Sequence, residues 1–210
     1  MRRKKLAMAL ALLASGCGGE DDDLVCDGSG SRFVTSVEET AWGDGQSFGR
    51  DRMPQVVEGP PRGAGTSQGS MDVVSLGNGG LIVVGFVDNG IVDGPGTDFV
   101  VFENPFETPS GAVFAELGTV AVSDDGESWF EFGCTAIEPP YGDCAGHHPV
   151  QLNGVDGPFD PETSGGDPFD LAVVGLARAR YVRVVDRPDL EGFDGVFDLD
   201  AVGIVHAACP

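Results

Sequence analysis

Short apolar runs bounded by turn residues set the pattern of this chain. The clearest run is residues 98–104 (DFVVFEN), which follows a GPG turn and ends before Pro105. Because successive side chains of a strand point to opposite faces, Phe99, Val101 and Glu103 share one face. A carboxylate at the end of a strand buried on both faces must be hydrogen-bonded, paired or bound to a metal, since an isolated buried charge is strongly unfavourable. Glu103 is therefore the first candidate site residue.

The remaining apolar runs also predict strands, and we see no helical periodicity. Residues 71–76 and 81–86 flank a GNGG turn, which predicts a hairpin. Two long segments rich in Gly, Pro and polar residues, 41–70 and 134–166, are predicted to be loops. About eight short strands between turns are typical of an all-β sandwich. The other predicted strands are residues 32–40, 114–122, 127–132, 169–176, 180–186 and 197–205.

The N-terminus has the pattern of a processing signal. Residues 1–16 combine four basic positions with a short apolar run, and they are excluded from the fold. The ASGC sequence ending at Cys17 resembles the lipobox of bacterial lipoproteins, which implies lipidation of Cys17; an ordinary signal peptide is the alternative. Residues 17–25 predict an acidic tether, and residues 26–210 a single domain. We therefore expect an exported protein attached by its lipid to the bacterial cell envelope, at the outer membrane or cell surface.

Four cysteines remain after Cys17, and in an exported chain they suggest two disulfides. Of the three possible pairings we favour Cys134 with Cys144, which closes a short loop, and Cys26 with Cys209, which ties the ends of the domain together. Metal binding by these thiols is the weaker alternative, because the chain has no CxxC or Cys/His spacing.

The charge balance excludes nucleic acid as a ligand. Four of the 12 Lys and Arg residues lie in the signal, so the mature part has eight Arg against 34 Asp and Glu, a net charge of −26. An excess of acidic residues with 33 Gly suits oxygen-ligand cation sites. Solvated acidic loops that keep an exported protein soluble are the simpler interpretation of most of these charges.

Three segments, in order, resemble the discoidin and galactose-binding-like jelly rolls, a group that includes many carbohydrate-binding modules. They are residues 120–129 (VAVSDDGESW), 179–184 (ARYVRV) and 197–202 (FDLDAV). The resemblance implies a jelly-roll β-sandwich. Residues 98–104, 165–172 (GGDPFDLA) and 197–202 are more closely similar to a set of bacterial cell-surface proteins. That similarity implies a binding or adhesive role at the surface and names no ligand.

Two classes of function follow from these observations. In the first, the domain is a binding module for a glycan or another extracellular ligand, with Trp129, Tyr141 and His147 as the residues most available for stacking. In the second, it is a structural or adhesive protein that contacts other surface proteins. A secreted hydrolase is less expected, because no G-x-S-x-G elbow or spaced Ser, His and acid set is present. We therefore expect no catalytic residues.

A structural Ca²⁺ is what such jelly rolls often carry. We expect Glu103 and Asn104 to bind it, with help from Asp88, Asp98 or Asp167. Capping of backbone N–H groups by the same side chains is the alternative. Asp198 and Asp200 are expected to face a neighbouring loop or Arg180 or Arg183, and a bridge to one of these Arg residues is the alternative to metal there. His147 and His148 are adjacent; on an extended chain they point opposite ways, so at most one of them is expected to join a site without distortion of the chain.

Overall fold

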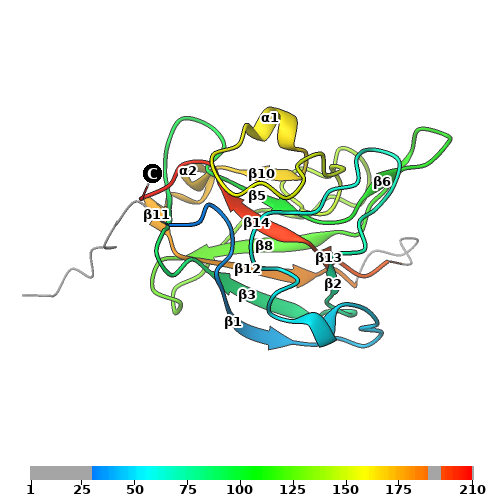
Figure 1. Ribbon diagram of the computed structural model, residues 1–210, viewed down its shortest axis with the longest axis horizontal. Coiled ribbons are helices and arrows are strands. Elements are labelled where there is room, and N and C mark those ends of the chain that lie inside the picture. The colour runs from blue at the N-terminus through cyan, green and yellow to red at the C-terminus, as the bar shows by residue number, and fades with distance from the viewer. Residues whose placement is uncertain (1–29, 189–194, 210) are drawn as a thin grey trace, which may run out of the picture.

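The computed structural model describes residues 30–188 and 195–209; the predicted signal segment, the tether and Cys26 lie outside them. Two antiparallel sheets form the two layers of an all-β sandwich (Figure 1). The larger sheet has the strand order β1 (Ser36–Ala41), β3 (Leu81–Gly85), β12 (Tyr181–Asp186), β8 (Gly118–Ser123) and β9 (Phe130–Glu131). The smaller sheet has the order β10 (Asp167–Phe169), β5 (Phe99–Phe102) and β14 (Ala201–Ile204). The predicted fold class is confirmed.

Shorter elements connect these layers. Three two-stranded pairs are β2 (Val74–Ser75) with β13 (Asp198–Leu199), β4 (Ile91–Val92) with β11 (Arg178–Ala179), and β6 (Phe106–Glu107) with β7 (Val113–Phe114). The helical turns are η1 (Arg50–Arg52), α1 (Pro161–Ser164) and α2 (Leu171–Val174). Among the described residues, no helix is long and apolar enough to cross a membrane.

β5 is buried on both faces, as its unbroken apolar run predicts. Phe99 and Val101 belong to the main core between the two sheets. Val100 and Phe102 belong to a second cluster on the other face, which includes Phe33. A strand with two apolar faces therefore needs a cover on each side, and loops supply the outer one.

The larger sheet keeps one face in the core and turns the other outward. On β12, Val182 and Val184 are buried, whereas Tyr181 and Arg183 point the other way and remain partly exposed. This is the inside-outside alternation of a half-buried antiparallel strand. The outward face is thus free to carry polar chemistry.

The hairpin predicted from residues 71–76 and 81–86 is wrong. β2 pairs with β13, and β3 pairs with β1 and β12. Gly43 donates its N–H to the carbonyl of Leu76 (2.9 Å), and Leu76 donates its own N–H to the carbonyl of Phe197 (3.0 Å). The backbone groups that a hairpin would use are therefore taken by distant parts of the chain.

The strand predicted over residues 169–176 is also wrong, because the chain turns into α2 after β10. Asp170 caps this helix by accepting the N–H of Ala172 (2.8 Å), and Gly175 ends it in the left-handed conformation (φ 71°). An Asp cap and a glycine four residues after the first helical position are standard signals of helix ends. Both signals are present in the sequence, but the apolar residues between them also fit a strand.

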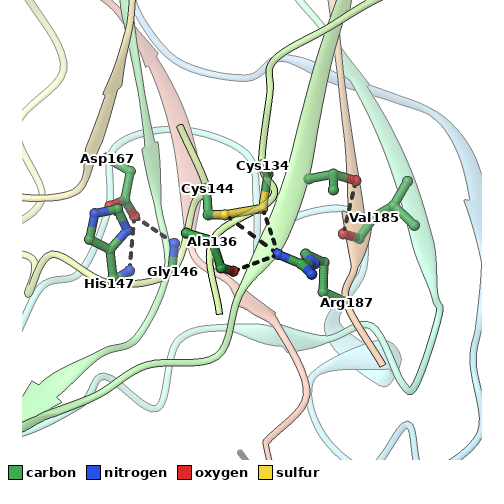
Figure 2. Close-up of a disulfide and its surroundings, with 9 residues drawn as sticks. Cys134, Ala136, Cys144, Gly146, His147, Asp167, Val185 and Arg187 are labelled. Atoms are coloured by element: carbon green, nitrogen blue, oxygen red, sulfur yellow. Dashed lines mark hydrogen bonds and ion pairs between the residues drawn. A yellow bond between two sulfur atoms is a disulfide. The ribbon is translucent and has the colours of Figure 1, made fainter. Parts of the chain in front are cut away.

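The predicted Cys134–Cys144 disulfide is confirmed. Together with Ala115, Leu117 and Tyr141 it forms a small apolar cluster of its own. Figure 2 shows the guanidinium of Arg187 beside it, donating to the carbonyl of Ala136 (2.9 Å) and to Cys134 Sγ (3.4 Å). Cys209 is buried and disulfide-bonded, but Cys26, its predicted partner, lies outside the described residues.

Candidate functional site

The five residues predicted to bind Ca²⁺ do not form one site. Asp98 and Glu103 lie at opposite ends of β5, about 17 Å apart at the usual rise of a strand. Asp88 is exposed in the turn after β3, and Asp167 begins β10. Only Glu103 and Asn104 stay together.

Asp98 is fully buried and satisfied by the protein. Its Oδ1 accepts the N–H of Gly94 (2.8 Å) and lies 2.7 Å from Nδ1 of His206. Its Oδ2 accepts the N–H of Leu171 (2.7 Å). Three partners hold this carboxylate, so Asp98 fixes the end of β5 to α2 and the C-terminal segment. The capping alternative describes it well.

Glu103 is the opposite case. It is fully buried, its Oε1 accepts the N–H of Asp198 (3.2 Å), and its Oε2 has no hydrogen-bond partner among the described residues. Burial raises the pKa of Glu103 well above its usual value, and the charges of Glu116 and Asp198 raise it further. Without a positive charge nearby, the ionised form of this carboxyl is disfavoured.

The acidic neighbours of Glu103 are perturbed in the same direction. Burial raises the pKa of Glu116 to about 7, with the charge of Asp198 adding to it and the N–H of Val196 opposing it. Burial also raises the pKa of Asp198 to about 6, against hydrogen bonds from Ser75 and Asn104. We call Glu103, Asn104, Glu116 and Asp198 the oxygen cluster. The negative charge of each acid raises the pKa of the others, whereas a bound cation would lower these pKa values.

Asn104 adds a neutral oxygen to this cluster. Its Oδ1 is buried and, like Glu103 Oε2, has no hydrogen-bond partner in the described part of the chain. Glu103 and Asn104 line a small hollow closed by residues 63–65 and 68–70. The backbone passes Asn104 so closely that a Cβ at Gly69 would lie 2.5 Å from Oδ1, which explains a glycine there.

The predicted bridges from Asp198 and Asp200 to Arg180 or Arg183 are wrong. Arg180 lies 3.9 Å from Asp124, and the Arg183 guanidinium lies over Trp129. Both carboxylate oxygens of Asp200 instead accept the backbone N–H of Arg62 (3.1 and 3.0 Å). Burial raises the pKa of Asp200 to about 8, although that hydrogen bond lowers it. The alternation in FDLDAV thus directs Asp200 toward a neighbouring loop rather than toward a cation.

A second cluster joins Asp167 to the two adjacent histidines. Nδ1 of His147 and Nδ1 of His148 each lie 2.8 Å from the same oxygen, Oδ1 of Asp167. The expectation that at most one histidine could join a site is therefore wrong. Alternation applies to extended chain, whereas the chain bends here both at Gly146, which has a left-handed φ of 95°, and at His148; the centroids of the two imidazole rings lie 4.1 Å apart.

The electrostatics of this cluster favour an ionised Asp167. Burial opposes ionisation of its carboxyl, but the two imidazoles outweigh burial and lower the pKa of Asp167. The hydrogen bond with Asp167 raises the pKa of His148. A carboxylate and two imidazoles can form ion pairs, and the same three groups can also bind a metal ion.

The three residues predicted to stack on a ligand fall in two places. Tyr141 and His147 meet edge to face, with ring centroids 5.5 Å apart, and line a pocket of about 710 Å³ together with His148, Pro139 and Pro140. Tyr141 itself is only 5% exposed, because it packs on the disulfide cluster. Trp129 lies elsewhere, on the outward face of the larger sheet.

Trp129 lines a hollow of about 400 Å³ on that outward face. The turn before it is fixed by Asp125, which accepts the N–H groups of Glu127 (2.8 Å) and Ser128 (2.7 Å). The Arg183 guanidinium lies 4.6 Å from the Trp129 ring centroid. The other residues that line this hollow are Glu38, Glu39, Leu81, Val83, Asp125, Gly126 and Tyr181.

Tyr181 and Arg183 were not predicted from the sequence as ligand-binding residues. The signal was available, because the two lie at alternate positions of ARYVRV and must share the face opposite Val182 and Val184. What sequence alone could not supply is Trp129 beside them. It reaches that face through the β8–β9 connection.

Comparison with known proteins adds no identity: no protein-family model matches this chain, and no curated protein matches it either.

Proposed function

We propose that this chain is a non-catalytic binding module of the bacterial cell envelope, which holds a glycan on the outward face of its larger sheet. The observation that carries the proposal is the hollow around Trp129, where an aromatic ring, a guanidinium and several carboxylates surround an open space of about 400 Å³. That volume is within the roughly 300 to 1,000 Å³ usual for ligand sites.

The chemistry of the hollow suits a sugar. Sugar rings present C–H groups on their faces, which pack on the electron-rich face of an aromatic ring, and hydroxyls at their edges, which both donate and accept hydrogen bonds. Trp129 and Tyr181 supply the rings. Nε of Arg183 is buried and makes no hydrogen bond within residues 30–188 and 195–209, while Glu38 and Asp125 supply acceptors. Oε1 of Glu38 already accepts the Ser36 hydroxyl (2.6 Å) and Oδ1 of Asp125 the N–H of Ser128 (2.7 Å), so their second carboxylate oxygens are the acceptors that a ligand could use. A guanidinium beside such oxygens suits hydroxyls, which both donate and accept.

Export and lipid anchoring at Cys17 are part of the proposal. The signal pattern of residues 1–16 and the lipobox-like ASGC support it, and the Cys134–Cys144 disulfide is consistent with an oxidising compartment. The resemblance of residues 120–129, 179–184 and 197–202 to galactose-binding-like jelly rolls points to the same class of surface module.

A structural Ca²⁺ at the oxygen cluster completes the proposed function. Ca²⁺ takes six to eight oxygen ligands from carboxylates, amides and carbonyls, so the donor types of the cluster fit this ion. Glu103, Asn104 and Asp198 would hold it, and Glu116 would balance its charge. The support is a pair of buried oxygens, Glu103 Oε2 and Asn104 Oδ1, for which the described residues provide no hydrogen-bond partner. The ion would supply charge neutralisation and no chemistry.

A glycan array with the purified protein tests the proposal. We expect binding that Trp129→Ala reduces at least tenfold, since stacking and guanidinium contacts are both lost. Trp42→Ala, a change in the other tryptophan, is the matched control; Trp42 also carries an Arg, with the Arg50 guanidinium 5.3 Å from its ring centroid. An array without glycan binding, together with capture of envelope proteins, would contradict the glycan proposal and favour the adhesive role.

A further inference from the structure

We infer that His147, His148 and Asp167 bind a divalent transition-metal ion, Zn²⁺ in the first instance, at the edge of the pocket beside Tyr141. This site shares no residue with the Trp129 hollow or the oxygen cluster, so it stands independently of the proposed function. It would give the domain a second metal of a different chemical class.

Three ligand atoms converge on one point of the molecule. Nδ1 of His147, Nδ1 of His148 and a carboxylate oxygen of Asp167 all lie within 4.8 Å of one another. Both nitrogens are 2.8 Å from Asp167 Oδ1. With metal-ligand bonds of roughly 2.0 to 2.1 Å, the ligands of a tetrahedral site are about 3.3 Å apart. Outward movement of both rings by about half an ångström would open that space; the His148 ring is more than half exposed and so moves most easily.

The carboxylate is held so that one oxygen remains for the ion. Oδ2 of Asp167 accepts the N–H groups of Gly146 (2.6 Å) and His147 (3.3 Å), which leaves Oδ1 directed at the two imidazoles. Figure 2 shows Asp167 and His147 side by side, near the disulfide. Such hydrogen bonds to a ligating carboxylate orient it and are a usual part of metal sites.

The loop that carries the histidines is fixed on both sides. Cys144 precedes Gly146 and is tied to Cys134, and the ring of Tyr141 packs edge to face on His147. A Cβ at Gly146 would collide with the carbonyl of Glu116, so only glycine allows the bend. The backbone that carries the ligands is therefore preorganised, and adjustment of the side chains alone would admit the ion.

Hydrogen bonding alone does not satisfy this cluster. Nδ1 of His148 forms a hydrogen bond with Asp167 Oδ1. Nδ1 of His147 is buried and lies 2.8 Å from the same oxygen, but among the described residues it forms no hydrogen bond. A cation between the three atoms would take both nitrogen lone pairs and the free carboxylate oxygen. Two imidazoles and a carboxylate select Zn²⁺ and similar ions over Ca²⁺, which prefers oxygen ligands only.

Three protein ligands leave a coordination position open. The His148 side chain is 55% exposed, and the pocket of about 710 Å³ beside it is lined by Val113, Pro139, Pro140 and Tyr141. Solvent can therefore reach the ion, and the pocket gives room for a further ligand. Structural zinc sites are closed by four protein ligands, whereas sites with three protein ligands keep a position for water or an external group.

Calorimetric titration of the purified protein with Zn²⁺ tests this inference, with Ca²⁺ present throughout and any oligohistidine tag removed. We expect one Zn²⁺ per chain. His148→Ala should weaken the affinity at least tenfold; because this side chain is exposed, the variant is expected to fold, and its melting temperature verifies that. His206→Ala is the matched control, since His206 pairs with Asp98 outside the cluster, and it should leave Zn²⁺ affinity unchanged.

Co²⁺ gives a second measurement that a merely structural cluster would not produce. The wild-type protein should develop the visible absorption bands of Co²⁺ with nitrogen and oxygen ligands at low coordination number, and His148→Ala should abolish them. Absence of Zn²⁺ binding in the wild-type protein would overturn the inference. So would Zn²⁺ binding that His148→Ala leaves unchanged, or that His206→Ala weakens instead.

Discussion

Asp198 donates its backbone N–H to Oε1 of Glu103 across 3.2 Å, so two acidic residues meet with a single hydrogen bond between them. The second oxygen of Glu103 has no hydrogen-bond partner among the described residues, and burial with nearby negative charge raises its pKa. Buried carboxyls of this kind destabilise a fold at neutral pH unless a cation joins them. The Ca²⁺ predictions follow from this relationship.

Ca²⁺ should raise the melting temperature of the protein at pH 8, measured after EDTA treatment and again after Ca²⁺ is added back. At a hundredfold excess over Kd, an ion that binds only the folded state stabilises it by about 2.7 kcal/mol. For a domain of this size that corresponds to a shift of roughly 5 to 10 °C.

Glu103→Gln should abolish that shift and should stabilise the metal-free protein at pH 8, because burial opposes ionisation of the Glu103 carboxyl and an amide does not ionise. Glu131→Gln, on exposed β9, should keep the Ca²⁺ response. An unchanged response in Glu103→Gln would place the ion elsewhere.

Lipid anchoring predicts a change of compartment on Cys17→Ala. The variant should lose membrane association and move to the soluble fraction, because the lipid is the only anchor that we propose. Fractionation of cells with immunodetection measures this. Membrane association that persists in the variant would show that another element holds the protein there.

The sequence predicted β5 well because a turn precedes a short apolar run. An apolar run without polar alternation indicates a strand that is buried on both faces. It predicted the Cys134–Cys144 disulfide because a short loop brings the two residues together whatever the rest of the fold does. It missed the partner of β2. Pairing across the sheet depends on distant segments, and the Gly-rich turn after β2 fits a hairpin equally well.

The candidate site residues were also predicted where local sequence decides their position and missed where distant segments decide it. Glu103 and Asn104 were found because a buried strand end makes a local argument. Asp88, Asp98 and Asp167 could not be placed, since their positions depend on which strand ends meet. The His147–His148 pair was misjudged because the chain bends there instead of running extended. Gly146 has a left-handed φ and passes close to the carbonyl of Glu116, a contact between segments that the sequence does not show.

Asp200 should make the stability of the metal-free protein fall as pH rises. Its pKa is about 8 in the fold, raised by burial and by the charge of Asp72, and lowered by the Arg62 N–H and the Arg62 charge. A raised folded-state pKa means that the stabilisation is complete below the ordinary value near 4 and is lost as pH rises through about 8. Calorimetry in EDTA from pH 5 to pH 9 should show a falling melting temperature.

Asp200→Asn should flatten that pH dependence by several degrees, since an amide keeps an acceptor for the Arg62 N–H and carries no charge. Asp124→Asn, at the exposed pair with Arg178, serves as the comparison and should leave the slope as it is. A slope that Asp200→Asn does not change would mean that other acids set it, Glu116 with its pKa of about 7 being the first to examine.

Removal of the Cys134–Cys144 disulfide should lower both stability and Zn²⁺ affinity. The bond closes a loop of sequence separation 10. In the chain-entropy model such a loop contributes about 3 kcal/mol, so the double serine variant should melt roughly 6 to 12 °C lower. The same variant frees the chain two residues before Gly146, so the His147–His148–Asp167 cluster should lose preorganisation and bind Zn²⁺ at least several-fold more weakly. The Ca²⁺ response, which depends on the end of β5, should remain. Equal losses of both metal responses would instead indicate general unfolding, and the melting curve in Ca²⁺ separates the two outcomes.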